Sequence, residues 1–186
     1  EKFFATDILK EKGFSRGQCT ECGMYYWSLE ERTVCGEPEC GEGYTFINNS
    51  PTSETFTHTE SWKKFQEFMQ NREYASIDRY PVVARWRGDV EFTGASIYCF
   101  QPHVVSGEAE PPARELIIPQ PSLRFNDVDN VGITGRHYTN FTMIGQACFQ
   151  PPEEYEQSRY FKDMFEYTSE TLGIPQEKMI FHEEAW

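Results

Sequence analysis

The chain has 186 residues, 38% of them hydrophobic and 16% aromatic, and its formal net charge is −13. This composition suits one globular domain with a small appended module, and the acidity argues against a generic polyanion-binding protein, because such binding needs clustered lysine and arginine. The sequence contains no 18-residue apolar run and no signal-peptide pattern, so we expect a cytoplasmic protein with no membrane partner.

The first fifty residues are predicted to form a short helix followed by a turn-rich segment. Residues 1–14 place apolar side chains on one helical face, and Gly13 is typical of a helix end. Residues 16–47 are rich in turn-forming residues and contain four clustered cysteines. The polar stretch 48–55 is typical of a connector.

The next predicted element is a helix over residues 57–72. Thr57 or Thr59 can cap its N-terminus. Apolar side chains recur there at helical spacing and indicate a core-facing stripe: Trp62, Phe65, Phe68 and Met69.

From residue 80 onward the pattern shifts towards a period of two, which favours strands. The expected strands are rich in β-branched and aromatic residues and cover residues 82–86, 90–100, 116–125 and 139–149. Residues 153–172 then predict a second long helix, with Gly173 suited to the position after its C-terminus. Strand runs between two helices, without strand–helix alternation, favour an α+β fold with a mainly antiparallel sheet.

The four clustered cysteines have the spacing of a metal site. Cys19, Cys22, Cys35 and Cys40 form the pattern C-x2-C-x12-C-x4-C, in which two turns each present a pair of thiols. Zinc prefers four soft ligands in a tetrahedron, so we predict a structural zinc ion held by these residues. Two disulfides or four free thiols are the alternatives, and a cytosolic location disfavours disulfides.

Two short basic segments are candidates for anion binding. Arg85 and Arg87 would share one face of the expected strand 82–86 and its extension, where a solvated face is an equally good interpretation. Arg124 would end one strand of the expected hairpin and His137 would start the next, with a polar loop between them, and each can contact a phosphate. Past His137, Phe141 and Met143 would offer a flat apolar platform for a purine ring.

The runs RYPVVARWRGDVEFTGASIYCFQP (79–102) and QPSLRFNDVDNVGITGRHYTNF (120–141), preceded by the four-cysteine module, resemble alanyl-tRNA synthetases of the archaeal type. The resemblance extends over essentially the whole chain. It implies the class II synthetase fold, an antiparallel sheet flanked by helices, with a zinc-binding module over residues 1–50. It also implies that residues 51–186 form a partial catalytic domain that lacks the third motif.

The resemblance further implies an activity and a set of site residues. ATP, as its Mg²⁺ complex, and L-alanine would form alanyl-adenylate, and alanine would pass to the acceptor end of tRNA(Ala). Arg124 would be the catalytic residue at the α-phosphate, and His137 would lie towards the γ-phosphate. Phe141 or Met143 would support the adenine, and Trp186 would wall the alanine pocket.

Two departures from the family pattern leave a second interpretation open. Thr142 stands where the family usually has Glu, and the third motif is missing, so the remainder of the synthetase is an expected partner, as the same polypeptide or a separate one. This segment alone would then be weak or inactive. The alternative is a non-catalytic, zinc-containing relative that keeps the synthetase fold for binding or regulation.

Overall fold

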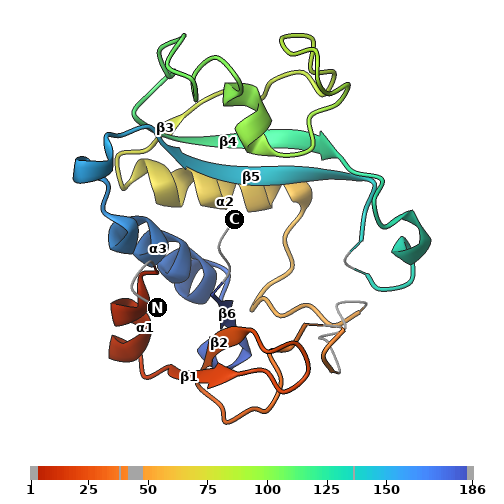
Figure 1. The fold of residues 1–186 in the computed structure, drawn as a ribbon, viewed down its shortest axis with the longest axis vertical. Coiled ribbons are helices and arrows are strands. Elements are labelled where there is room, and N and C mark those ends of the chain that lie inside the picture. The colour runs from red at the N-terminus through yellow and green to blue at the C-terminus, as the bar shows by residue number, and fades with distance from the viewer. Residues whose placement is uncertain (1–3, 38, 42–47, 136, 184–186) are drawn as a thin grey trace. The chain divides into compact units, whose positions relative to one another are not determined.

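The computed structural model describes residues 4–37, 39–41, 48–135 and 137–183 (Figure 1). The chain forms two compact units. The first contains residues 1–55 and 156–186, and the second contains residues 56–155. These two units are defined by contacts in space. The expected division at residue 50 instead separates a zinc-binding module from a catalytic domain, and it stays a prediction.

The second unit is built on two long strands. Strand β4 (Glu115–Leu123) pairs antiparallel with β5 (Asn140–Cys148) along their entire lengths, and the short strand β3 (Ala75–Ser76) runs parallel to β4. Helix α2 (His58–Gln70) lies along one face of this sheet (Figure 1). Near the start of β4, Leu116, Ile117 and Ile118 are all fully buried, because both faces of the sheet are covered there.

The two faces of this sheet have different neighbours. On one face, Phe65 and Met69 of α2 are completely buried, and the Tyr74 hydroxyl accepts a hydrogen bond from Gln146 of β5 (2.8 Å). On the other face, Leu116 and Ile118 pack with Cys99 and Phe100. Successive residues of β5 therefore point alternately towards α2 and towards the segment around Phe100.

Helix α2 begins with a capping box. The Thr57 hydroxyl accepts from the Glu60 backbone N–H (3.3 Å), and the Glu60 carboxylate accepts from the Thr57 N–H (2.8 Å). Two backbone donors at the helix start are thus satisfied. The structure selects Thr57 over Thr59 as the cap and confirms the predicted core stripe at Phe65 and Met69.

The strands predicted at residues 82–86 and 90–100 are wrong. The backbone reverses at Ala84, whose carbonyl accepts from the Arg87 N–H (3.3 Å), so strand pairing is limited to a single bridge between Val83 and Phe92. Residues Ser96–Phe100 form a 3₁₀ helix instead. Cys99 and Phe100 of this segment are buried in the core, a role that the period-two pattern does not distinguish from burial in a strand.

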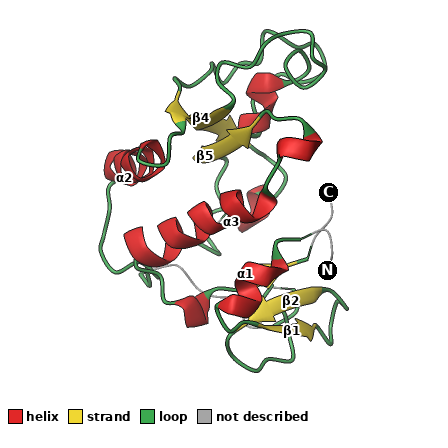
Figure 2. Cartoon of the chain, turned by 90° about the vertical axis from the view of Figure 1, so that its left-hand side faces the viewer, coloured by secondary structure: helices red, strands yellow, loops and turns green. Residues whose placement is uncertain are grey.

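The first unit contains a small sheet that sequence patterns did not predict. Strands β1 (Ser15–Gln18) and β2 (Tyr25–Ser28) form a hairpin inside the turn-rich segment, and β6 (Phe181–His182) joins the other edge of β2. All pairs are antiparallel. Figure 2 shows α1 (Thr6–Glu11) beside this sheet.

The small sheet also separates two groups of side chains. Trp27 packs on Leu9, Phe14, Phe165 and Met179 in an apolar cluster, and Phe181 packs against that cluster. The neighbouring residue Tyr26 instead belongs to the cluster formed by the cysteines. Paired strands place opposite residues on the same face, so His182, opposite Tyr26, lies on the cysteine side.

Helix α3 (Gln157–Glu166) continues as a π turn over Tyr167–Thr171. The helix therefore begins four residues later than predicted, after a 3₁₀ turn at Pro152–Glu154. Gly173 has a left-handed φ of +65°, as expected after a helix end. None of the helices in the described ranges is long and apolar enough to cross a bilayer.

Candidate functional site

A pocket of about 330 Å³ lies at the loop end of the hairpin that β4 and β5 form. Arg124 follows the last residue of β4, and Phe141 is the second residue of β5. Three of the four residues predicted to bind ATP share this pocket. Its lining comprises Arg124, Asp127, Val131, His137, Tyr138 and Phe141.

Arg124 is fixed in place from two sides. Its Nε donates a hydrogen bond to the carbonyl of Gly94 (2.8 Å), and its guanidinium carbon lies 5.3 Å from the centroid of the Phe141 ring. Within the described part of the chain, no carboxylate forms an ion pair with this exposed guanidinium. Arg124 therefore presents an oriented, uncompensated positive charge beside an aromatic face, an arrangement suited to a phosphate next to a base.

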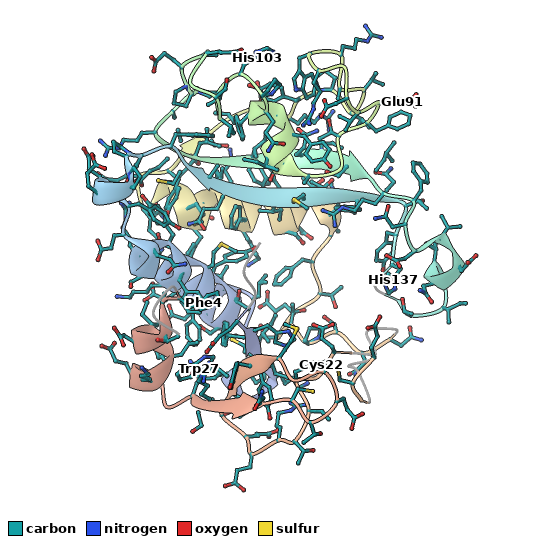
Figure 3. All side chains as sticks on the ribbon, viewed as in Figure 1. Phe4, Cys22, Trp27, Glu91, His103 and His137 are labelled. Carbon is teal, nitrogen blue, oxygen red and sulfur yellow. The ribbon has the colours of Figure 1, made fainter. Side chains whose placement is uncertain are left out.

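His137 lies in the loop between β4 and β5, as Figure 3 shows, and not at the start of a strand as predicted. Strand β5 begins only at Asn140, so the expected alternation does not reach back to His137. Its Nδ1 lies 2.6 Å from Oγ1 of Thr134. This contact with another residue of the same loop orients the imidazole ring. This contact uses Nδ1, and no hydrogen bond from the described residues occupies Nε2, which can therefore bind a ligand.

Met143 shares a strand face with Phe141 but does not line the pocket. Its Sδ lies 3.4 Å from the backbone N of Ser96 and 3.5 Å from Ser96 Oγ. Met143 thus packs against the 3₁₀ segment, and of the two residues predicted to support the adenine only Phe141 lines the pocket. Trp186, the predicted alanine-pocket residue, lies outside the described residues.

Thr142, the departure from the family pattern, faces the other side of the sheet. Its Oγ1 lies 2.9 Å from Nε2 of His58, the first residue of α2. The substitution therefore falls on the face opposite Phe141, and Thr142 is not among the residues that line the pocket.

Arg87, a candidate for anion binding, already binds a carboxylate of the protein in the structure. Its guanidinium binds both carboxylate oxygens of Asp89, at 2.7 and 2.5 Å, and its side chain is only 11% exposed. This ion pair raises the pKa of Arg87 and lowers the pKa of Asp89. Arg85, in the turn, is exposed and shares no strand face with Arg87.

The four cysteines converge in the first unit. Their Sγ atoms all lie within 4.8 Å of one another, and those of Cys22 and Cys35 are 3.8 Å apart. A tetrahedral ion with bonds of about 2.3 Å to sulfur holds its ligands about 3.8 Å apart, whereas a disulfide needs about 2.05 Å. All four thiols are free, and the geometry fits zinc.

Tight turns bring the thiols together. Gly23 (φ +75°) donates its N–H to the Cys19 carbonyl (3.0 Å), and the Cys40 N–H donates to Glu37 (3.0 Å). Gly36, with a φ of +83°, makes the corresponding reversal after Cys35. Both glycines occupy backbone conformations that other residues rarely adopt, which explains their place beside each cysteine pair.

The electrostatics of the cluster favour a cation. A hydrogen bond from the Cys22 backbone, the largest of several causes, lowers the pKa of Cys19 to about 6. Burial raises the pKa of Cys35, and the hydrogen bond to Cys22 raises that of Cys40. One thiolate forms easily while its neighbours resist a second negative charge, and a divalent ion removes that resistance.

Sequence reasoning missed several residues around these sites. Tyr138 and Val131 line the hairpin pocket. Both lie in a loop, where no repeat of apolar residues predicts which side chains face the pocket. Ile180 and His182 contact the cysteine cluster from the far end of the chain. The local sequence does not indicate that Ile180 and His182 belong to this cluster, because both reach it only when β6 pairs with β2, about 150 positions earlier in the chain.

Comparison with known proteins identifies the family of this chain. Residues 60–186 match the family model of the class II (A) tRNA synthetases, so the chain belongs to this family. The match confirms the predicted fold class, an α+β domain with an antiparallel sheet and helices.

Similar proteins narrow the resemblance to one kind of synthetase. The chain is 44% identical to the alanine–tRNA ligase of Methanocella arvoryzae and 45% identical to that of Methanopyrus kandleri, over 100% and 98% of its own length. It is 43% identical to the alanine–tRNA ligase of Thermococcus kodakarensis over 97%. The predicted resemblance to archaeal alanyl-tRNA synthetases is confirmed. The chain spans only 20–22% of the length of these relatives.

Proposed function

We propose that this chain is the ATP-facing part of an alanyl-tRNA synthetase. The observation that carries the proposal is the pocket in which the Arg124 guanidinium lies beside the Phe141 ring, with His137 on the loop between β4 and β5. The 41–45% identity to several archaeal alanine–tRNA ligases supports alanine as the amino acid. The remainder of the synthetase would supply the third motif and the tRNA-binding parts.

The proposed chemistry needs positioning and charge stabilisation and no general base. A carboxylate oxygen of alanine attacks the α-phosphorus of ATP, the bond to the bridging oxygen breaks, and pyrophosphate leaves with the electron pair. Negative charge builds up on the α-phosphate during this step, where Arg124 would stabilise it. His137 would hold the γ-phosphate and Phe141 the adenine, with Mg²⁺ bound to the phosphates. Transfer of alanine to the acceptor end of tRNA(Ala) would follow.

We further propose that Cys19, Cys22, Cys35 and Cys40 hold one structural zinc ion. The convergence of the four Sγ atoms, all within 4.8 Å of one another, supports this assignment, and four cysteine ligands leave no position for a substrate. Metal analysis of protein prepared without chelator is expected to find about one zinc per chain. A metal-free preparation would contradict the assignment.

The activity is tested by alanine-dependent ATP–pyrophosphate exchange in the full-length protein. Arg124→Ala should reduce kcat/KM for exchange by about 100- to 1,000-fold, the usual loss on removing one donor to a developing charge. Arg114→Ala is the matched control, because Arg114 precedes the same strand and contacts Glu154 at its other end. Equal effects of the two substitutions would contradict the role of Arg124.

A non-catalytic relative is the second candidate, and Thr142 favours it. The family carboxylate is missing at this position, and the threonine side chain contacts His58 instead. If a full-length protein with intact zinc shows no exchange with any amino acid, this second candidate is correct. Exchange with alanine alone would exclude it.

A further inference from the structure

The segment 179–183 runs along the cysteine cluster and alternates between two environments. Met179 and Phe181 pack in or against the apolar cluster around Phe165, whereas Ile180 packs on the cysteines. His182 lies opposite Tyr26, which is itself part of the cysteine cluster. Every second side chain of this segment therefore forms part of the wall around the thiols.

Ile180 fits into the space left by a missing side chain. A Cβ atom built on Gly36 would lie 2.7 Å from Cδ1 of Ile180, closer than real Cβ contacts allow. Gly36 directly follows Cys35, so Ile180 presses on the backbone that carries one of the ligands. Any displacement of this segment therefore changes the support of that turn.

His182 holds the same turn through a hydrogen bond. Its Nε2 donates to the backbone carbonyl of Cys35 (3.0 Å), and its Nδ1 lies 3.4 Å from a carboxylate oxygen of Glu37. Its side chain is only 17% exposed. His182 is not one of the four clustered ligands, and it positions a ligand through the ligand's own backbone.

We propose that the segment 179–183 is a structural part of the metal site, so that metal binding at the cysteines and docking of β6 on β2 are energetically coupled. The inference rests on the proposed zinc site. Ile180 and His182 hold the Cys35 turn in its ligating geometry, and the bound metal in turn fixes the surface on which they pack. Thermodynamic linkage requires that docking of β6 strengthens metal binding by the same free energy as metal binding strengthens docking of β6.

The first test measures backbone amide exchange of the full chain with zinc bound and after chelation. Removal of zinc should accelerate exchange at residues 181–183 by about 5- to 150-fold, the usual range of coupling between two sites. The amides paired between β4 and β5 are the internal control and should not change. Unchanged exchange at 181–183, in protein that demonstrably binds zinc, would overturn the coupling.

The second test measures zinc affinity by competition with a chromophoric chelator. His182→Ala should weaken zinc binding by about 10- to 100-fold, as is typical for residues that orient metal ligands. His103→Ala is the control, because His103 lies in the other unit and binds Glu108. Equal zinc affinities for the two variants would overturn the role of His182.

A third test isolates the contact between Ile180 and Gly36. Gly36→Ala and Gly23→Ala introduce the same side chain at similar positive φ values, +83° and +75°, but nothing lies within 4 Å of the new Cβ at Gly23. The excess loss of zinc affinity at Gly36 therefore measures the collision with Ile180. Ile180→Val removes the colliding Cδ1 atom and should recover most of this excess in the double variant.

The outcomes separate the two proposals. A wild-type protein that binds no zinc overturns the metal site and the coupling together. A protein that binds zinc, but in which Gly36→Ala equals Gly23→Ala and β6 exchange ignores chelation, overturns the coupling alone. The coupling is supported if zinc slows amide exchange at residues 181–183 and if Ile180→Val restores the zinc affinity of Gly36→Ala.

Discussion

At the residue scale, Arg16 and Trp27 hold the carboxylate of Glu183 through hydrogen bonds. Arg16 donates through Nε and Nη2, each over 2.7 Å, and the indole N–H of Trp27 donates over 2.7 Å. The side chain is only 7% exposed. The hydrogen bonds from Arg16 are the main cause that lowers the pKa of Glu183 from its usual 4.5 to about 2.

This lowered pKa predicts how acid affects the first unit. Above pH 4.5 the carboxylate is ionised in both the folded and unfolded chain, and its stabilisation is complete; it is lost as the pH falls towards 2. Glu183→Gln should lower the free energy of unfolding by about 1.5–3 kcal/mol near pH 6, the value of hydrogen bonds to a charged group. The difference from wild type should shrink between pH 4.5 and 2.

Urea denaturation of both proteins under identical conditions checks this prediction, because effects of cysteine protonation then cancel. Glu177→Gln is the control, since Glu177 is exposed. A difference between wild type and Glu183→Gln that stays constant down to pH 2 would contradict the assignment.

The residues of both candidate sites could be proposed from the sequence, but the contacts that hold them in place could not. The cysteine cluster follows from spacing alone, since 22 residues of chain contain all four cysteines. Arg124 and His137 follow from a local pattern. The contacts of Arg124 with Gly94 and of Cys35 with His182 join residues 30 and 147 positions apart, and nothing in the local sequence encodes them.

At the element scale, the start of α2 gives a clean comparison of two threonines. Thr57 caps the helix in a reciprocal pair with Glu60, whereas Thr59 lies inside the first turn. Thr57→Ala should lower the free energy of unfolding by about 1 kcal/mol, and Thr59→Ala by only a few tenths. Chemical denaturation measures both, and equal losses would show that the capping box contributes nothing.

Helices were easier to predict here than strands, and the reason is physical. Helix α2 has a cap and an apolar stripe within 13 residues, so its signal is local. The segment 82–100 has strand-like composition, but a reversal at Ala84 and burial of Phe100 against β4 replace the ladder. Strands β1 and β2 were missed because four-residue strands inside a cysteine-rich loop show no alternation long enough to detect.

At the scale of the whole molecule, the proposed metal site lies within one of the two units. The cysteines and β6 lie in the unit of residues 1–55 and 156–186. Chelation should therefore expose residues 16–41 and 157–183 to a protease, because zinc binding and folding are coupled. Strands β4 and β5 should remain protected. Peptide mapping after limited proteolysis checks this, and uniform cleavage of both units would contradict it.

The order of synthesis determines when the small sheet can be completed. Trp27 of β2 and Glu183, which follows β6, are 156 positions apart, so roughly 8–30 seconds separate their emergence from the ribosome at about 5–20 residues per second. During that interval β2 has an open edge with unpaired N–H and C=O groups, which invites pairing with foreign strands. The arrival of β6 closes this edge and completes the wall around the thiols in the same event.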